Sequence, residues 1–186
     1  MSGMFPKLRS SARRYRSEEK GAAAVEFALV LTLLTIPILN VADLALYAWD
    51  KMQVDNAAQA AVQAAWATCN LSTELPATPN AYLKCPAMPA AVTQAAQSTT
   101  LGAAVTVTST TENYYCVNTS TNVLEVVGTF PNTKPADCSS VGSASDKPGD
   151  HVLITVSYTY TPIFSLVSIA SQLQTPITRQ AWMQLG

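Results

Sequence analysis

A long apolar stretch close to the N-terminus is the feature that most constrains this chain. Residues 22–42 contain one charged side chain, that of Glu26. At ~1.5 Å per residue, a helix over these residues spans about 31 Å, which matches the hydrocarbon core of a bilayer. The stretch therefore predicts a membrane-spanning helix. A cleaved secretory signal is the alternative, although the apolar part is long for one and no small-x-small site ends it.

Pro37 lies inside the predicted span. Proline frees a helical carbonyl one turn earlier, which a neighbouring helix or the hydroxyl of Thr32 or Thr35 would have to satisfy. We therefore expect a kink near residues 33–37.

The charges are divided unevenly about the apolar stretch. The first twenty residues carry six basic and two acidic side chains, a net charge of +4, whereas the remainder carries five basic and ten acidic side chains, a net charge of −5. A basic cluster before an apolar span indicates a cytoplasmic N-terminus, with a nucleic-acid-binding arm as the alternative. A chain of 186 residues has room for one folded domain. We expect a cytoplasmic leader over 1–21, the span over 22–42 and an extracytoplasmic domain over 43–186.

Glu26 is a charged residue inside the predicted membrane span. An ionised carboxylate inside a membrane span is costly, so it indicates a function unless a partner neutralises it. Cleavage after Gly21 would create such a partner, because the new α-amino group of Ala22 would lie one helical turn from Glu26 of the same chain, or close to Glu26 of a neighbouring chain. The alternative is that Glu26 lies near enough to the membrane interface to reach water.

The junction between leader and span reads G-x-x-x-x-E and resembles the cleavage site of type IV prepilins, which a membrane aspartic peptidase processes on the cytoplasmic side. A longer pattern resembles the TadE-like pseudopilins of the tight adherence pilus. It comprises residues 21–31 (GAAAVEFALVL), Asp43, Tyr47, residues 53–58 (QVDNAA) and the late run 154–164 (ITVSYTYTPIF). Many relatives place proline earlier in the span and have Glu where Asp43 stands.

This resemblance implies a minor pseudopilin that takes part in assembly of a type IV pilus and supports surface attachment. Cleavage would fall between Gly21 and Ala22, and Glu26 and Phe27 would set the register between subunits. The implied partners are a prepilin peptidase, other pilins and pseudopilins, and the lipid of the bacterial inner membrane. Neither a nucleic acid nor a small-molecule substrate is implied.

Beyond the span, the spacing of apolar residues predicts that the helix continues to about residue 68, for roughly forty-five residues in all. The apolar positions would face the core of the domain, and small alanine side chains on the helix could also form a surface for other pilins. These positions are Leu44, Tyr47, Ala48, Val54, Ala58, Ala61, Val62 and Ala65.

The remainder predicts a small antiparallel sheet, and hence an α+β, pilin-like fold. Residues 70–90 read as a loop, and a short helix follows at 90–98. We expect three strands, over 104–117, 122–130 and 151–164, and a strand or short helix over 175–185. The sequence from Lys147 to Asp150 fits a type II turn with Gly149 at its third position.

Four cysteines lie on the predicted extracytoplasmic side, where two disulfides are the default. Of the three possible pairings we favour Cys69 with Cys85 and Cys116 with Cys138, because each would close a loop rich in Pro, Asn and Ser. A zinc site is the alternative, but the chain has no C-x-x-C pair and only one histidine. We expect no metal and no cofactor.

The chain offers little for catalysis. Its one histidine, His151, is expected to be an exposed residue at the start of a strand, and phosphate-binding glycine motifs are absent from the sequence. We therefore expect no enzyme. The main alternative to a pseudopilin is a signal-anchored periplasmic binding or adhesion module, and an anchored enzyme is a third hypothesis. Cross-strand packing or a binding face would explain four tyrosines, Tyr114, Tyr115, Tyr158 and Tyr160.

Overall fold

The computed structural model describes residues 7–69 and 85–185. The chain forms two compact units, one of Met1–Ala45 with Pro162–Gln172 and one of Leu46–Thr161 with Leu173–Gly186. Most of the predicted loop over 70–90 lies outside the described residues.

The helix α1 (Lys7–Thr68) has 62 residues and is longer than the sequence predicted. It begins before the apolar stretch because the leader is rich in Arg, Glu and Lys, which favour helix. It continues through Pro37 without interruption, and the kink there stays a prediction. The hydroxyls of Thr32 and Thr35 donate to the carbonyls of Ala28 and Leu31, at 2.8 and 2.7 Å. Both carbonyls lie earlier in the helix than the one that Pro37 frees. The two hydroxyls therefore do not satisfy that carbonyl, contrary to one of our expectations.

The distal part of α1 carries the predicted apolar stripe. Its buried side chains recur every three or four residues, and each is at most 1% exposed: Val54, Ala57, Ala58, Ala61, Val62 and Ala65. Ala48, which was predicted to belong to the stripe, is exposed. The stripe packs on the sheet, and one ion pair joins the two elements, from Arg179 Nε to Asp55 Oδ1 at 2.8 Å.

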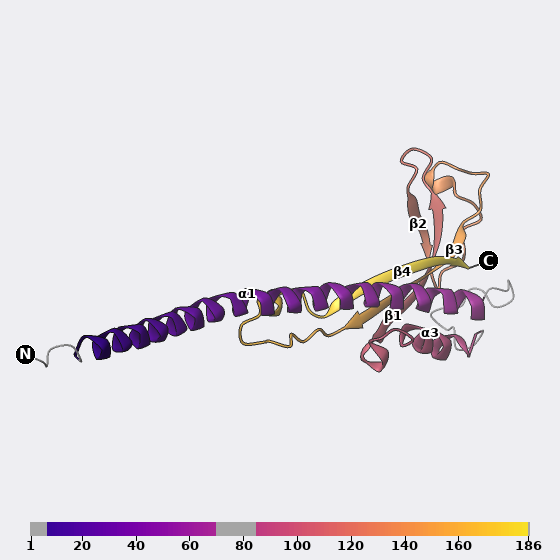
Figure 1. Cartoon of the computed structure of the whole chain (residues 1–186). Helices are drawn as coiled ribbons and strands as arrows, with labels where there is room; N and C mark the ends of the chain where they lie inside the picture. Colours follow the sequence, from indigo (N-terminus) through magenta and orange to yellow (C-terminus); the bar gives the residue numbers. More distant parts are fainter. Residues whose placement is uncertain (1–6, 70–84, 186) are drawn as a thin grey trace, which may run out of the picture. The chain divides into compact units, whose positions relative to one another are not determined.

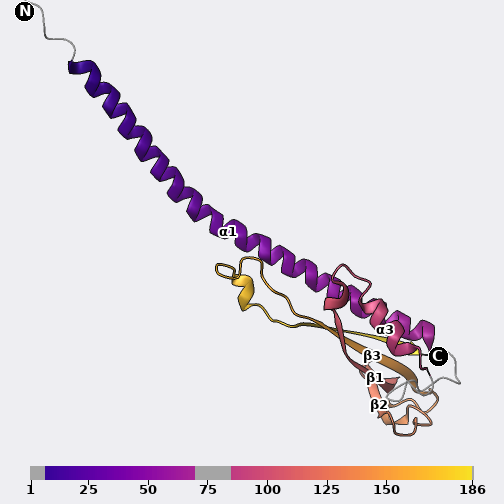
Figure 2. The same cartoon turned by 90° about the horizontal axis from the view of Figure 1, so that it is seen from below.

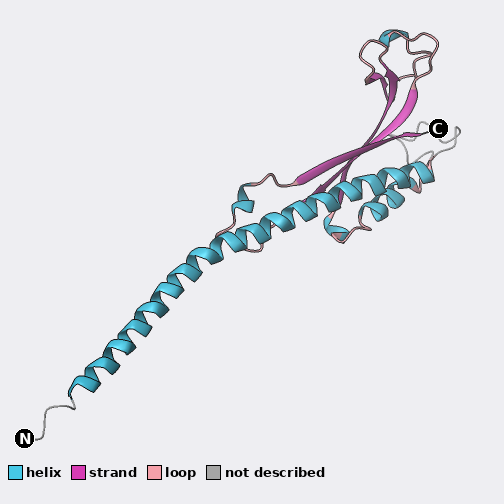
Figure 3. Cartoon of the chain, turned by 45° about the horizontal axis from the view of Figure 1, so that its top comes forward, coloured by secondary structure: helices cyan, strands magenta, loops and turns pink. Residues whose placement is uncertain are grey.

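The sheet contains four antiparallel strands in the order β2-β1-β3-β4 (Figures 1 and 3). The strands are β1 (Thr106–Val117), β2 (Leu124–Thr129), β3 (Gly149–Tyr158) and β4 (Ile177–Leu185). Alternate residues of β3 and β4 line the core, because successive side chains in a strand point to opposite faces. They are Val152, Ile154, Val156, Ile177, Ala181 and Leu185. The three predicted strands are present, the third with different bounds, and the last predicted element forms the strand β4 rather than a helix.

Two predictions about β3 are wrong. The strand ends at Tyr158 and does not run on to Phe164. The last residue of β3 that pairs with β4 is Tyr158, whose partner is Ile177. Pro162 lacks the backbone N–H that a longer ladder would need. Gly149 already belongs to β3 and does not have a positive φ angle, so the predicted type II turn is not formed.

The predicted short helix is α3 (Met88–Ala96), which begins two residues earlier than expected. Pro89 lies in its first turn, where a missing N–H costs nothing. The buried side chains of Met88, Val92 and Ala96 recur at a helical spacing and form one apolar face.

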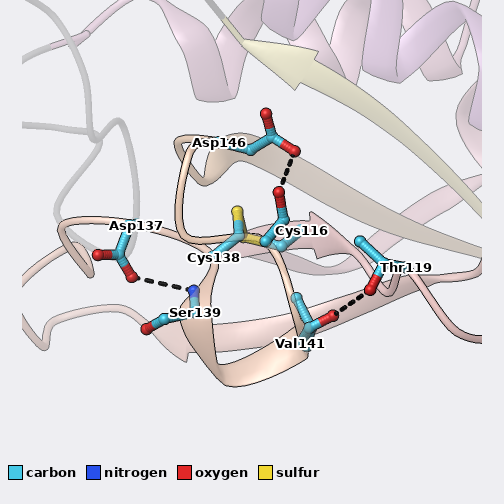
Figure 4. The surroundings of a disulfide bond; sticks show 8 residues. Cys116, Thr119, Asp137, Cys138, Ser139, Val141 and Asp146 are labelled. Carbon is cyan, nitrogen blue, oxygen red and sulfur yellow. Dashed lines mark hydrogen bonds between the residues drawn. A yellow bond between two sulfur atoms is a disulfide. The ribbon is translucent and has the colours of Figure 1, made fainter.

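Both predicted disulfides are present, between Cys69 and Cys85 and between Cys116 and Cys138. Figure 4 shows the second of them, which joins Cys116 in β1 to Cys138 in the loop between β2 and β3. Side chains close this loop locally: Asp137 Oδ1 accepts from the Ser139 amide at 2.9 Å, and the Thr119 hydroxyl donates to the Val141 carbonyl at 3.4 Å. The cross-link and the bond from Thr119 tie the loop between β2 and β3 to the end of β1.

Candidate processing and assembly segment

Gly21 lies within α1, although glycine is among the poorest residues for a helix interior. A Cβ atom added at Gly21 would meet no atom within 4 Å. Packing therefore does not require glycine here, and its presence costs the helix roughly 0.5–1 kcal/mol relative to alanine. The helix places Ala22 one turn before Glu26, as the sequence predicted.

Glu26 and Phe27 project from the most apolar part of α1. Both side chains are exposed, Phe27 to 67%. Large apolar side chains surround the helix on all sides over residues 25–41, and none of those that follow is less than 46% exposed: Val25, Leu29, Val30, Leu31, Leu33, Leu34, Ile36, Ile38 and Val41. A surface this apolar needs a cover of lipid or of other helices. By length and composition, α1 is the one helix among the described residues that could span a bilayer.

Asn40 and Asp43 stand where this apolar surface ends, and they hold the backbone of Pro162–Gln172. Asn40 Oδ1 accepts from the Ile169 amide at 2.6 Å, and its Nδ2 donates to the Val167 carbonyl at 3.0 Å. The Asp43 carboxylate is fully buried and accepts from the amides of Ile163 and Phe164, at 3.1 and 3.2 Å. Figures 2 and 3 show this segment beside α1.

Sequence reasoning missed this contact. Asp43 and the run 154–164 were both noted, but nothing in the sequence linked them across some 120 positions. The sequence signal for this contact was the pair Asn40 and Asp43, two polar residues one helical turn apart where the apolar span ends.

In the second unit, Tyr47 of α1 contacts residues on either side of the segment Pro162–Gln172. Its ring packs edge-on against Tyr160, with ring centroids 5.2 Å apart, and its hydroxyl donates to the Gln174 carbonyl at 3.1 Å. Tyr160 therefore packs against the helix and not across the sheet. Tyr115 does pack within the sheet, 5.1 Å from the ring of His151.

The family comparison adds to this geometry. Residues 21–63 match the model of a family described as TadE-like protein. Over these residues the chain is similar to TadE-like proteins. The match begins at Gly21 and contains Glu26, Asn40, Asp43 and Tyr47, whereas the sheet lies outside it. Comparison with curated proteins and with solved structures finds no significant match.

His151 departs from its prediction. It is only 6% exposed, within β3 and between the rings of Tyr115 and Trp182. Burial lowers the pKa of its imidazole below the usual 6.5. Its location within an aromatic cluster accounts for its burial without a catalytic role.

A pair of carboxyl groups is buried on the other face of the sheet. Glu112 and Asp150 are each 3% exposed. Burial raises the pKa of Asp150, opposed by a hydrogen bond with Glu112 and by the charge of Lys134. Among the residues that the structure describes, no three His, Cys, Asp or Glu side chains gather as a metal site would require.

Proposed function

We propose that this chain is a minor pseudopilin that takes part in assembly of a tight adherence pilus and so supports surface attachment. The observation that carries the proposal is the TadE-like segment itself. It begins at Gly21 and continues as a helix whose apolar surface is exposed on all sides. Such a helix fits a subunit that resides in lipid before assembly and against other pilin helices afterwards.

In this proposal a prepilin peptidase removes residues 1–21 on the cytoplasmic side of the inner membrane. Residues 22–42 span that membrane, and residues 43–186 fold in the periplasm, which suits two disulfides. The basic leader holds the N-terminus in the cytoplasm until cleavage. The subunit then passes to a pilus or to an assembly complex at the membrane.

Glu26 would act after cleavage. In the full chain the helix continues through Gly21, so Ala22 has no free amino group to offer. Cleavage creates an α-ammonium group one turn from Glu26, and the helix N-terminus adds a favourable dipole. An ion pair within the chain or with a neighbouring subunit then offsets the cost of a carboxylate in lipid. Phe27, beside it, would pack against the neighbouring helix and help to set the register.

Substitutions at Gly21 test the processing step. The open space around the Gly21 Cβ position allows larger side chains without disturbing the described fold. With the peptidase present, we expect Gly21→Ala to be cleaved, because the site stays small, and Gly21→Leu to keep its leader and to fail in assembly. A Gly21→Leu chain that keeps its leader and functions normally would favour the tethered binding or adhesion module instead.

Substitutions at Glu26 test the assembly step separately. We expect Glu26→Gln to insert into the membrane at least as well as the wild type, because it removes a charge. It should nevertheless lose co-purification with other pilins, whereas Glu26→Asp should retain part of it. Normal association of Glu26→Gln would contradict the proposed ion pair.

A further inference from the structure

The segment Pro162–Gln172 exposes apolar side chains that the proposed function does not use. Leu166 is 98% exposed, and three other apolar side chains of the segment are also exposed: Ile163, Val167 and Ile169. Residues 151–178 contain no Asp, Glu, Lys or Arg. Several exposed apolar side chains within an uncharged segment are unusual on a surface that faces only water.

The hydrogen bonds of Asn40 and Asp43 fix the level of this segment along α1. Asn40 Nδ2 donates both to the Ile36 carbonyl of its own helix and to the Val167 carbonyl of the segment. Asp43, one turn further on, holds the amides of Ile163 and Phe164. The segment therefore lies beside the last turns of the apolar stretch over 22–42.

The segment also satisfies part of its own backbone. The amides of Val167 and Ser168 donate to the Phe164 carbonyl at 3.0 and 2.9 Å, and the Ala170 amide donates to the Ser168 hydroxyl at 3.1 Å. Irregular backbone is costly in a bilayer because unpaired N–H and C=O groups lose their water. Internal pairing, together with the caps from Asn40 and Asp43, reduces that cost at the boundary between headgroups and acyl chains.

We propose that Pro162–Gln172 is a second membrane-contacting element, which inserts Leu166 and its apolar neighbours into the interfacial layer of the periplasmic leaflet. The inference rests on the proposed function only in requiring that residues 22–42 span the membrane. Its chemistry is that of an interfacial anchor: apolar side chains enter the bilayer boundary while the chain remains tied to a spanning helix. The partner is lipid, and a neighbouring pilin helix is the competing occupant.

Single cysteines introduced into the full-length protein test the proposal. The four native cysteines are buried in disulfides, so a maleimide fluorophore labels only an added thiol. Leu166→Cys reports on the segment, Leu33→Cys on the span, and Thr133→Cys on an exposed polar loop of the second unit. Each labelled protein is reconstituted alone, at low density, into vesicles of phosphatidylethanolamine and phosphatidylglycerol. Quenching by nitroxide lipids is then compared with quenching by aqueous iodide.

We expect nitroxides near the headgroups to quench most of the emission of the Leu166 label. Nitroxides deeper in the acyl chains should quench the Leu33 label, and only iodide should quench the Thr133 label. If the Leu33 label responds to lipid but the Leu166 label is quenched as strongly by iodide as the Thr133 label, the segment faces water and the proposal is wrong. If the Leu33 label also responds only to iodide, the membrane span itself is wrong. If the Leu166 label is not quenched by lipid, and becomes protected from iodide only when other pilins are added, the surface belongs to a protein partner and the lipid proposal is wrong.

Discussion

The helix α1 contains two stretches that differ in how their apolar side chains are buried. Over residues 22–42 large apolar side chains are exposed on every side, whereas over residues 54–65 one stripe is buried and the opposite side is polar. The distal stretch has its partner within the chain, because β3 and β4 supply the facing core. The proximal stretch has no comparable cover among the described residues. The difference indicates that the fold of the domain depends on the distal stretch, and that the proximal stretch is built for contacts outside the chain.

The largest effect should come from a charge placed in the distal stripe. Val62 is fully buried, so Val62→Asp would bury an unpaired carboxylate, and we expect the free energy of unfolding to fall by about 3 kcal/mol or more. Urea titration of the protein in detergent, followed by tryptophan fluorescence, measures this. Gln63→Asp, at the adjacent exposed position, is the matched control and should change little. Equal urea midpoints for the two variants would contradict the assignment of the core.

The disulfide that follows the stripe should have the next largest effect. Cys69 and Cys85 are separated by 16 positions, and a loop of this size corresponds to about 3 kcal/mol of stabilisation. We expect the double variant Cys69→Ser/Cys85→Ser to unfold at lower urea than the wild type, with membrane association unchanged. The wild type treated with reductant should shift at least as far. No shift in either sample would show that the distal stretch does not need this cross-link.

Asp43, where the two stretches meet, should have a more local effect. Asp43→Ala removes the acceptor of two amides, and each hydrogen bond to a charged group contributes about 1.5–3 kcal/mol. We expect hydrogen exchange at Ile163 and Phe164 to accelerate by about tenfold or more, since 1.4 kcal/mol corresponds to a factor of ten. Asp43→Asn keeps one acceptor oxygen and should have an intermediate effect. Wild-type exchange rates in Asp43→Ala would rule out this role for the carboxylate.

The smallest effect concerns the sheet face that carries His151. Because burial lowers its pKa in the folded chain, the unfolded chain takes up a proton first as the pH falls through 6.5. The contribution of His151 to stability is therefore complete at higher pH and declines as the pH falls below about 6.5. We expect His151→Phe to lack this decline. The test is the difference between the urea midpoints of the wild type and of His151→Phe, measured from pH 5 to pH 8. The difference is used because the raised pKa of Asp150 changes stability with pH in the opposite direction in both proteins. A difference that does not vary with pH would contradict the burial of a neutral imidazole.

The sequence predicted features that depend on local pattern. The helix follows from apolar residues at intervals of three and four, and the strands follow from runs of Thr, Val and Tyr. The observed disulfide pairing was favoured because each cross-link closes a loop rich in Pro, Asn and Ser. The roles of Gly21 and Glu26 also rest on a local pattern, their spacing along one helix, and they stay predictions.

The features that the sequence did not predict depend on contacts between distant positions. The end of β3 is set by its pairing with β4 and by the capture of Pro162–Gln172, which involves residues more than a hundred positions away. The burial of His151 requires Tyr115 from β1 and Trp182 from β4. Neither neighbour can be assigned without the register of the sheet. The helical leader was missed for a different reason, because the basic cluster was interpreted by its charge and not by its helix propensity.

The most direct test of the account is the intact mass and N-terminal sequence of the protein isolated from the membranes of its own host, with and without reduction. We expect a chain that begins at Ala22 and carries two disulfides. A mature chain that still contains residues 1–21 would contradict it, because the amino group that is proposed to neutralise Glu26 would then not exist.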